Sequence, residues 1–315
     1  MGMLGNALLV ILGLCDAVSS IRIGAFNVQD FGQKKLQSTV SHSGTNISVQ
    51  TVLFEIIRRY DIVLIQEISM DDNNFHSFIM RLNTYVHGNS NPGYAYVISP
   101  YLGTGNDNRG KEKYAYIYNT RKIQIQGNMV FSNNPNHVNF DRPPYIVAVR
   151  DLTPGHAVKP FYLVGLHARP CNCIYEMMRL EKVYGWLRSS NPPFPSYDRV
   201  IFLGDFNAGC SYFKEGVDEH KVPFLYSNTE LRHLITGITN IAEKDKCPYD
   251  KMVASKCIFS RDTLLHNQIF NFSSALFHLT PLPTKESRKV SDHYPIEVEL
   301  TAKPNAPPPL GCVNP

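Results

Sequence analysis

The chain has 315 residues, of which 43% are hydrophobic and 18% charged, and its formal net charge is +4. This composition provides enough apolar side chains for a sizeable core and excludes a globally disordered chain. A single long apolar run, at the N-terminus, excludes a membrane protein with several spans. The small positive charge tolerates a polyanionic partner without requiring one.

The N-terminal segment is typical of a secretory signal peptide. Residues 7–15 are apolar but too short to cross about 30 Å of hydrocarbon. The small residues Ala17 and Ser19 fit the pattern that precedes a cleavage site. We therefore expect residues 1–20 to be removed and the protein to be secreted to the extracellular space. A buried first strand or an uncleaved anchor is the alternative.

Apolar patterns predict strands and helices from residue 21 to 302, with no linker that would divide them, and hence one domain. Residues 303–315 are rich in proline and are expected to form a tail without regular structure, held in place by Cys312. The predicted strands are 21–26, 61–66, 94–98, 113–118, 144–150, 161–166, 200–203, 251–259 and 296–300, and the predicted helices are 49–60 and 174–187.

Secretion makes the cysteines of the mature chain candidates for disulfides, although spacing alone does not select their pairing. Cys171 and Cys173 are separated by one residue, and this spacing does not favour a zinc site. Asn46 and Asn271 each begin an N-glycosylation sequon and are candidate glycosylation sites. The cysteines in question are Cys171, Cys173, Cys210, Cys247, Cys257 and Cys312.

Four predicted strands end in polar residues that are capable of chemistry, namely Asn27, Glu67, His167 and Asp205. Each of them alone is compatible with an ordinary turn. Because strands of a packed sheet present their ends at a common face, the four together predict a functional site there.

The residue types around these strand ends indicate metal-assisted chemistry on a phosphate group. Carboxylates and amides are hard oxygen ligands and suit Mg²⁺, Mn²⁺ or Ca²⁺ better than zinc. Imidazoles titrate near neutral pH and can move the protons that hydrolysis of a phosphodiester requires. The candidate oxygen ligands are Asn27, Glu67, Asp205, Asn207, Asp250 and Asp292, and the candidate histidines are His167 and His293.

Two segments resemble the signature sequences of deoxyribonuclease I and its secreted relatives: GDFNAGCSY at 204–212 and SDHYPIEV at 291–298. Shorter segments follow the same family in the same order, and the resemblance extends over about residues 21–301. The nine residues 204–212 are much more specific to this branch than the other motifs are. The shorter segments are 25–29, 66–67, 111–112, 166–168 and 247–250.

The resemblance implies a four-layer α/β sandwich, in which two packed mixed β-sheets are flanked by helices. It also implies a secreted endonuclease that hydrolyses DNA with little sequence specificity and uses Mg²⁺, for which Mn²⁺ can substitute. The protein is expected to be a monomer with no membrane partner. Actin, a partner of some family members, cannot be assigned here residue by residue.

The family's site residues are carried over position by position. The implied catalytic pairs are His167 with Glu112 and His293 with Asp250, and the order of acid and base stays open. The implied metal ligands are Glu67, Asp205 and Asp292, the implied substrate contacts are Asn27, Asn207, Tyr249 and Arg142, and the implied disulfide is Cys210–Cys247.

Several positions depart from the family pattern. Ser69 and Gly110 stand where the family has an arginine and a tyrosine that enter the DNA minor groove, and Arg109 lies in a longer segment, 104–110. We expect a weaker grip on B-form DNA or a different preference among duplex, single-stranded and protein-bound DNA. The loop that holds a structural Ca²⁺ in the family is replaced at 241–246, so a structural Ca²⁺ stays an open question.

Two other functions are compatible with the motifs. One is a phosphatase or phosphodiesterase of the same superfamily that acts on another substrate, although segment 204–212 argues against it. The other is a catalytically weak or inactive relative that serves as a DNA- or protein-binding module. The presence of both histidines and of their carboxylates argues against that second alternative.

Overall fold

A computed structural model describes residues 20–88, 93–103, 111–131, 139–154, 157–189, 198–277, 280–303 and 312. The predicted signal peptide up to Ser19, the segment with Arg109 and Gly110, and most of the predicted tail lie outside these residues. Among the helices of the described part, none is both long and apolar enough to span a bilayer.

The first sheet is mixed. Its parallel pair is β1 and β4, and all other neighbours run antiparallel. The strands follow the order β13 (Asp262–Ile269), β14 (Ile296–Ala302), β1 (Ile21–Phe31), β4 (Ile62–Ile68), β6 (Lys113–Asn119) and β5 (Tyr94–Ile98).

The second sheet repeats this design with β9 and β10 as its parallel pair. A separate two-stranded sheet joins β2 (Thr39–His42) and β3 (Thr45–Ser48). The second sheet has the order β11 (Leu231–His233), β12 (Asp250–Ser255), β10 (Val200–Asp205), β9 (Phe161–Gly165), β8 (Tyr145–Asp151) and β7 (Ile123–Val130).

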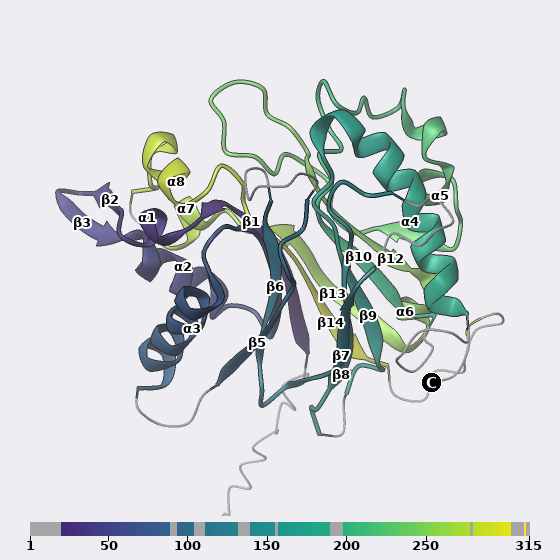
Figure 1. The fold of residues 1–315 in the computed structure, drawn as a ribbon, viewed down its shortest axis with the longest axis horizontal. Helices are drawn as coiled ribbons and strands as arrows, with labels where there is room; N and C mark the ends of the chain where they lie inside the picture. Colours follow the sequence, from purple (N-terminus) through teal and green to yellow (C-terminus); the bar gives the residue numbers. More distant parts are fainter. Residues whose placement is uncertain are drawn as a thin grey trace, which may run out of the picture.

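Helices cover the outer faces of both sheets, which confirms the predicted four-layer sandwich (Figure 1). One core lies between the sheets, and two further cores lie under the helices on either side. On the first sheet lie α1 (Gln33–Leu36), α2 (Val49–Ile57), α3 (Asp72–His87), α7 (Phe272–Ala275) and α8 (Thr284–Val290). On the second lie α4 (Cys173–Arg188) and α5 (Pro223–Tyr226). The remaining short helices are η1 (Pro170–Asn172), η2 (Glu219–Lys221) and α6 (Lys256–Arg261).

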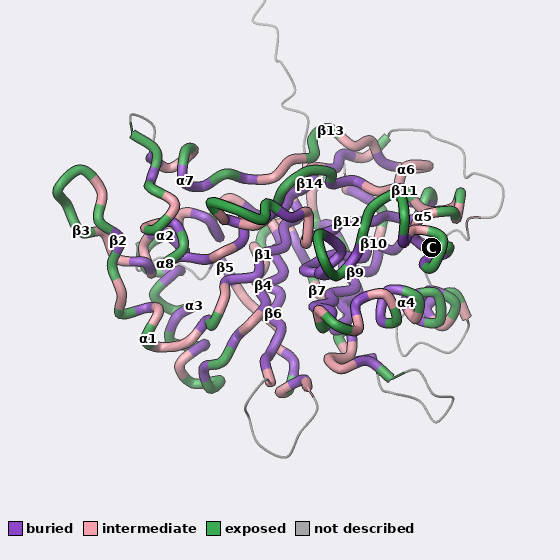
Figure 2. Tube along the Cα trace, turned by 90° about the horizontal axis from the view of Figure 1, so that it is seen from above, coloured by how far each residue is buried: buried purple, intermediate pink, exposed green. Residues whose placement is uncertain are grey.

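The continuous apolar runs of the central strands follow from burial on both faces (Figure 2). In β1, Ile23 and Ala25 pack into the core between the sheets, whereas Phe26 and Val28 pack under the helices. Because successive side chains of a strand point to opposite faces, a strand between two apolar layers needs apolar residues at every position.

The strand predicted at 251–259 is wrong in its second half. The chain leaves β12 at Ser255 and turns into α6, which buries Cys257 and Ile258. A short helix and a buried strand end have the same apolar composition, so periodicity over so few residues did not separate them. Helix α3 and strands β7 and β13 were not predicted.

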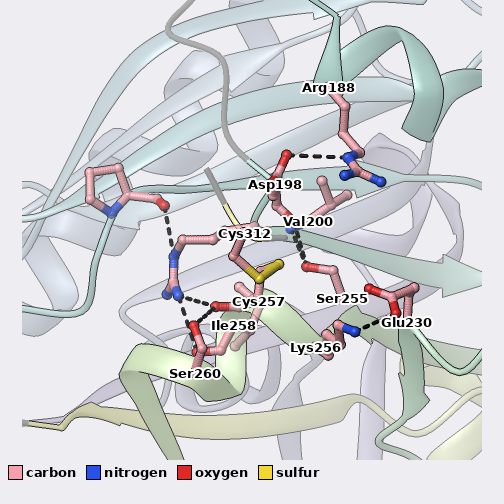
Figure 3. The surroundings of a disulfide bond; sticks show 12 residues. Arg188, Asp198, Val200, Glu230, Ser255, Lys256, Cys257, Ile258, Ser260 and Cys312 are labelled. Carbon is pink, nitrogen blue, oxygen red and sulfur yellow. Dashed lines mark hydrogen bonds and ion pairs between the residues drawn. A yellow bond between two sulfur atoms is a disulfide. The ribbon is translucent and has the colours of Figure 1, made fainter. Parts of the chain in front are cut away.

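The ends of the sandwich differ in what they hold. At the end where β10 begins, Cys257 forms a disulfide with Cys312, so the segment beyond β14 is tied to α6 (Figure 3). Next to it, Ser255 Oγ accepts a hydrogen bond from Val200 N and donates one to Asp198 O. The opposite end collects the polar residues that the sequence singles out.

Candidate active site

The topology brings the candidate residues to one edge of the sandwich. The parallel strands β1 and β4 carry Asn27 and Glu67 near their ends, and the parallel strands β9 and β10 end there near His167 and Asp205. Strands that run antiparallel to them begin at the same edge. Asp250 opens β12 and is the register partner of Asp205, while Glu112 precedes β6 and His293 precedes β14. Strand β1 continues past its predicted end at residue 26 to Phe31, with a register shift after Asn27.

Asn27 links the carboxylates of the two sheets. Its Nδ2 donates hydrogen bonds to Glu67 Oε1 at 2.8 Å and to Asp205 Oδ2 at 3.1 Å. Asp30 N donates to the other oxygen of Glu67 at 2.9 Å. Asn27 and Asp205 are almost fully buried, so these carboxylate positions are fixed before any substrate arrives.

The backbone at this edge is unusual. Glu67, Gln29, Asp30 and Asn207 have positive φ values of 60°, 51°, 49° and 48°. The pairing of β1 with β4 shifts register between Asn27 and Phe31, next to these residues. Non-glycine residues in this conformation cost about 1–3 kcal/mol each and persist where a functional geometry requires them.

His167 and Glu112 form the first histidine–carboxylate pair. His167 Nδ1 lies 2.8 Å from Glu112 Oε1, and Nε2 faces Asp205 Oδ2 at 3.5 Å. Tyr114 OH accepts a hydrogen bond from His167 N at 2.9 Å and fixes the backbone of the histidine. Arg142 Nη1 lies 3.4 Å from Glu112 Oε2, so a cation neutralises part of this pair.

His293 and Asp250 form the second pair with almost the same geometry. His293 Nδ1 lies 2.7 Å from Asp250 Oδ2, and Nε2 faces the same Asp205 oxygen at 3.6 Å. Ser291 Oγ accepts from His293 N and donates to Asn27 O, while Thr239 Oγ1 accepts from Asp250 N. Both histidines therefore present Nε2 to one point.

Each pair joins the two sheets. Glu112 leads into the first sheet and His167 leaves the second, whereas Asp250 belongs to the second and His293 leads into the first. The packing of one sheet on the other thus sets both hydrogen bonds.

Carboxylates dominate the electrostatics of the two histidines. Burial alone would lower the pKa of His167, but Glu112 and Asp205 outweigh this effect and raise the pKa. Burial opposes the charge of His293 in the same way, and Asp250 and Asp205 raise its pKa to about 10. Burial would raise the pKa of Asp205, yet His293 and His167 hold it below its ordinary value.

The donor set fits a hard divalent cation. Glu67, Asp205 and Asp292 supply carboxylate oxygens at this edge, and Gln29 Nε2 holds Asp292 Oδ2 at 2.9 Å. Asp292 Oδ1 is buried and has no hydrogen-bond partner among the described residues, and it lies 3.9 Å from His293 Nε2, so it can accept a ligand. Two groups with ligand atoms within 4.8 Å of one another also include the histidines: Glu67, Glu112 and His167, and Asp205, Asp250 and His293. The Nδ1 atoms of both histidines are already bound to carboxylates.

The remaining predicted residues lie around this centre. Asn207 Nδ2 donates to Ala168 O at 2.9 Å, and the Tyr249 ring lies 6.1 Å from the His293 ring. Arg142 is largely buried, and its Nε donates to His167 O. Its guanidinium thus supports the first pair, while its contact with a DNA backbone stays a prediction. A disulfide joins Cys210 to Cys247, two residues before Tyr249.

Sequence reasoning did not identify the residues that support the two pairs. Tyr114, Thr239, Ser291 and Gln66 accept hydrogen bonds from the backbone of His167, Asp250, His293 and Asp205. Ser291 and Gln66 lie within the motif segments 291–298 and 66–67, although no role was assigned to them there. Thr239 has none, because its contact with Asp250 depends on how the chain folds back.

Of the two positions that depart from the family's minor-groove residues, the structure describes Ser69 but not Gly110. Ser69 is exposed at the site edge, where Tyr101 OH donates to its carbonyl oxygen at 3.2 Å. Lys113 Nζ lies 4.3 Å from the centre of the Tyr101 ring. Gly110 and Arg109 lie outside the described residues, so the replacement of the lost cation by Arg109 stays a prediction.

Comparisons with known proteins agree with this geometry. The sequence model of the endonuclease/exonuclease/phosphatase family matches residues 44–219. Deoxyribonuclease gamma of Rattus norvegicus is 30% identical over 308 residues, which cover 94% of this chain and 89% of that protein. The chain belongs to the deoxyribonuclease I family. Deoxyribonuclease-1 of Bos taurus is 28% identical over 300 residues, which cover 93% of this chain and 97% of that protein.

Solved structures with low sequence identity share the fold. The catalytic domain of human Nocturnin, solved with a bound sulfate anion, has a TM-score of 0.57 at 14% identity, covering 90% of this chain and 94% of that domain. A mannosyl-6-phosphatase of Bacteroides thetaiotaomicron has a TM-score of 0.53 at 15% identity, covering 89% of this chain and 99% of that one. Because proteins with this fold differ in substrate, the fold does not select a substrate by itself.

Proposed function

We propose that this chain is a metal-dependent endodeoxyribonuclease that hydrolyses phosphodiester bonds with little sequence specificity. One observation carries the proposal: two buried histidines, each bound to a carboxylate through Nδ1, direct Nε2 to the same oxygen of Asp205 at 3.5 and 3.6 Å. Hydrolysis of a phosphodiester needs one proton to leave the attacking water and another to reach the leaving oxygen, and the two imidazoles can carry out these two transfers.

The proton transfers follow from the hydrogen bonds of the histidines. Glu112 and Asp250 hold Nδ1 of His167 and His293, so Nε2 is the nitrogen that exchanges a proton with the reactants. One imidazole takes a proton from the attacking water, and the other gives a proton to the leaving oxygen. The symmetry of the two pairs about Asp205 leaves the order of acid and base open.

Glu67, Asp205 and Asp292 would hold the divalent cation, for which Mg²⁺ fits the all-oxygen donor set and Mn²⁺ can substitute. Bound there, the cation supplies charge stabilisation for the phosphate in the transition state. The second N–H of Asn207 Nδ2 and the hydroxyl of Tyr249 would orient phosphate oxygens. A structural Ca²⁺ has no site of its own in this proposal.

The proposed substrate and location rest on different features. DNA is supported by the deoxyribonuclease relatives, and contacts to phosphates rather than to base edges would explain little sequence specificity. Secretion is supported by the predicted signal peptide and by the disulfides Cys210–Cys247 and Cys257–Cys312, and glycosylation by the sequons at Asn46 and Asn271. The described residues offer no basis on which to assign actin as a partner.

Plasmid degradation tests the proposal. The protein should nick supercoiled plasmid in Mg²⁺ and should stop when a chelator is added. His167→Ala and His293→Ala should each lower the rate about 100-fold or more, because each removes a group that moves a proton. His220→Ala is the matched control, because His220 is exposed and bonds only to Val217 O among the described residues. Cleavage that survives the chelator, or full activity of both histidine variants, would overturn the proposal.

A further inference from the structure

A cavity lies beside the two histidines, and its lining residues other than Tyr249 have no role in the chemistry described above. It has a volume of about 690 Å³ and lies between the 240–249 loop and α8. The residues that matter for its chemistry are Asn240, Lys244, Tyr249, Thr284, Lys285 and Arg288.

The cavity shares a wall with the catalytic centre. Tyr249 lines it and also lies against the ring of His293. Asn240 pairs with His293 in an isolated β-bridge, and Ile241 N donates to Asp292 O at 2.5 Å. A strand of DNA whose scissile phosphate lies at His293 therefore has this cavity as its neighbour.

The loop side of the cavity is held in place. Asn240 Nδ2 donates to Asp245 O at 2.9 Å, and Asn240 Oδ1 accepts from Cys247 N at 2.7 Å. The disulfide between Cys210 and Cys247 anchors the same loop to the end of the segment that follows β10. Lys244 thus extends from a fixed turn, which lowers the entropic cost of binding a ligand there.

The helix side is basic, and its cations are available. Lys285 and Arg288 are exposed, lie three residues apart on one face of α8, and form no ion pair within the described part of the chain. Glu286, between them, is engaged by Lys289 Nζ and Ser41 N. Glu243 and Asp245 also line the cavity on the loop side, so its three cations exceed its two carboxylates by one.

We propose that this cavity is a phosphate subsite, in which Lys285 and Arg288, with Lys244 opposite, bind a backbone phosphate of the DNA strand next to the scissile one. The inference rests on the proposed nuclease function and deepens it. The enzyme would then need DNA that extends beyond the scissile bond on the His293 side. The basic subsite would also supply part of the grip on DNA that Ser69 does not provide.

The test compares substrates of two lengths in three proteins: wild type, K285Q/R288Q and the control K182Q/R150Q. The control removes two exposed cations from α4 and β8, outside the cavity and the catalytic centre. kcat/KM is measured in Mg²⁺ for a tetranucleotide and for a duplex of several helical turns, over a range of salt concentrations.

For K285Q/R288Q we expect kcat/KM for the duplex to fall about tenfold relative to the control, since two charge-assisted contacts are lost. The ratio of duplex to tetranucleotide cleavage should fall with it, and the slope of log kcat/KM against log salt should become shallower by about one or two. Lys244→Gln, from the opposite wall, should change the ratio in the same direction by a smaller factor.

Equal ratios and salt slopes in K285Q/R288Q and the control would overturn the phosphate subsite while leaving the nuclease function in place. An equal loss on both substrates would also overturn it, because it would indicate a general defect, which the unfolding temperature would reveal. A wild type that cleaves neither substrate would instead contradict the proposed function.

Discussion

The two ends of the sandwich both join the sheets through buried charges, but they balance these charges differently. At the far end, Arg199 of the second sheet binds Asp262 of the first, and its Nε and Nη1 donate to the carbonyl oxygens of Pro160, Cys257 and Ile258. At the site end, the carboxylates of Glu67, Asp205 and Asp292 converge, and the ion pair of Arg142 is with Glu112.

The difference separates stability from function. The far end satisfies its cation completely and leaves little for a ligand to gain. The site end keeps negative charge and backbone in costly conformations. Such an arrangement is favourable only when a cation or a proton joins it, so changes at the two ends should affect different measurements.

The largest expected effect is on the rate, at the site end. Asp205→Asn preserves the shape of the side chain but removes the charge that faces both Nε2 atoms and Asn27. We expect plasmid cleavage to fall about 100-fold or more, because both histidines lose their shared partner. The free energy of unfolding, measured with urea near neutral pH, should fall by much less than the rate, because the lowered pKa of Asp205 means that folding favours its ionised form. A variant that keeps its rate would contradict the central position of Asp205.

The second largest effect is on stability and not on rate, and it is expected at the far end. Arg199→Met leaves Asp262 buried without its cation and should lower the free energy of unfolding by about 3–5 kcal/mol. The cleavage rate of the molecules that remain folded should not change. The double variant Arg199→Met/Asp262→Leu should regain most of the stability. If the single variant is as stable as wild type, the far end does not hold the sheets together.

The disulfides allow a finer contrast. Cys257 and Cys312 are 55 residues apart, so replacing both by serine should lower stability by up to about 4 kcal/mol at an unaltered cleavage rate. Cys210→Ser/Cys247→Ser should lower kcat/KM as well, because that bridge anchors the loop that carries Tyr249 and Asp250. Thermal unfolding and plasmid nicking of the two double variants measure both effects. Equal losses of activity would remove the distinction between the ends.

The smallest expected effect is on stability at acidic pH, and it concerns Glu297, which lies in β14. Burial would raise the pKa of Glu297, but hydrogen bonds from Arg59 and Gln268 lower it below its ordinary 4.5. Its contribution to stability is therefore present above pH 4.5 and is lost as the pH falls through the lowered pKa. Glu297→Gln should be less stable near neutral pH and should lose less stability on acidification. Urea unfolding across pH, with exposed Glu181→Gln as control, checks this.

The sequence predicted the site better than it predicted the surroundings. Apolar strands that end at Asn27, Glu67, His167 and Asp205 are local patterns, and these residues indeed meet at one edge. The Arg199–Asp262 pair joins residues 63 positions apart in two different sheets, and no local pattern signals it. The pairing of Cys257 with Cys312 was likewise open, because spacing does not reveal which loops close.

Some of the missed elements did carry a signal. Helix α3 buries Phe75, Phe78, Ile79 and Leu82, which have the spacing of one helical face, and Asp71 caps it by accepting from Asn74 N. Its polar residues obscured that pattern. Strand β7 lies at the edge of its sheet, and the burial of its side chains alternates along the strand. Its glutamines and its glycine are also common in loops, so the alternation was not recognised in the sequence.

Because each of the two histidines and its carboxylate come from opposite sheets, neither histidine–carboxylate pair exists until the sheets have docked. If these pairs carry the proposed chemistry, a chain that is still being synthesised or has partly unfolded is expected not to cleave DNA. Cleavage of DNA is therefore expected only from molecules in which the two sheets have packed together.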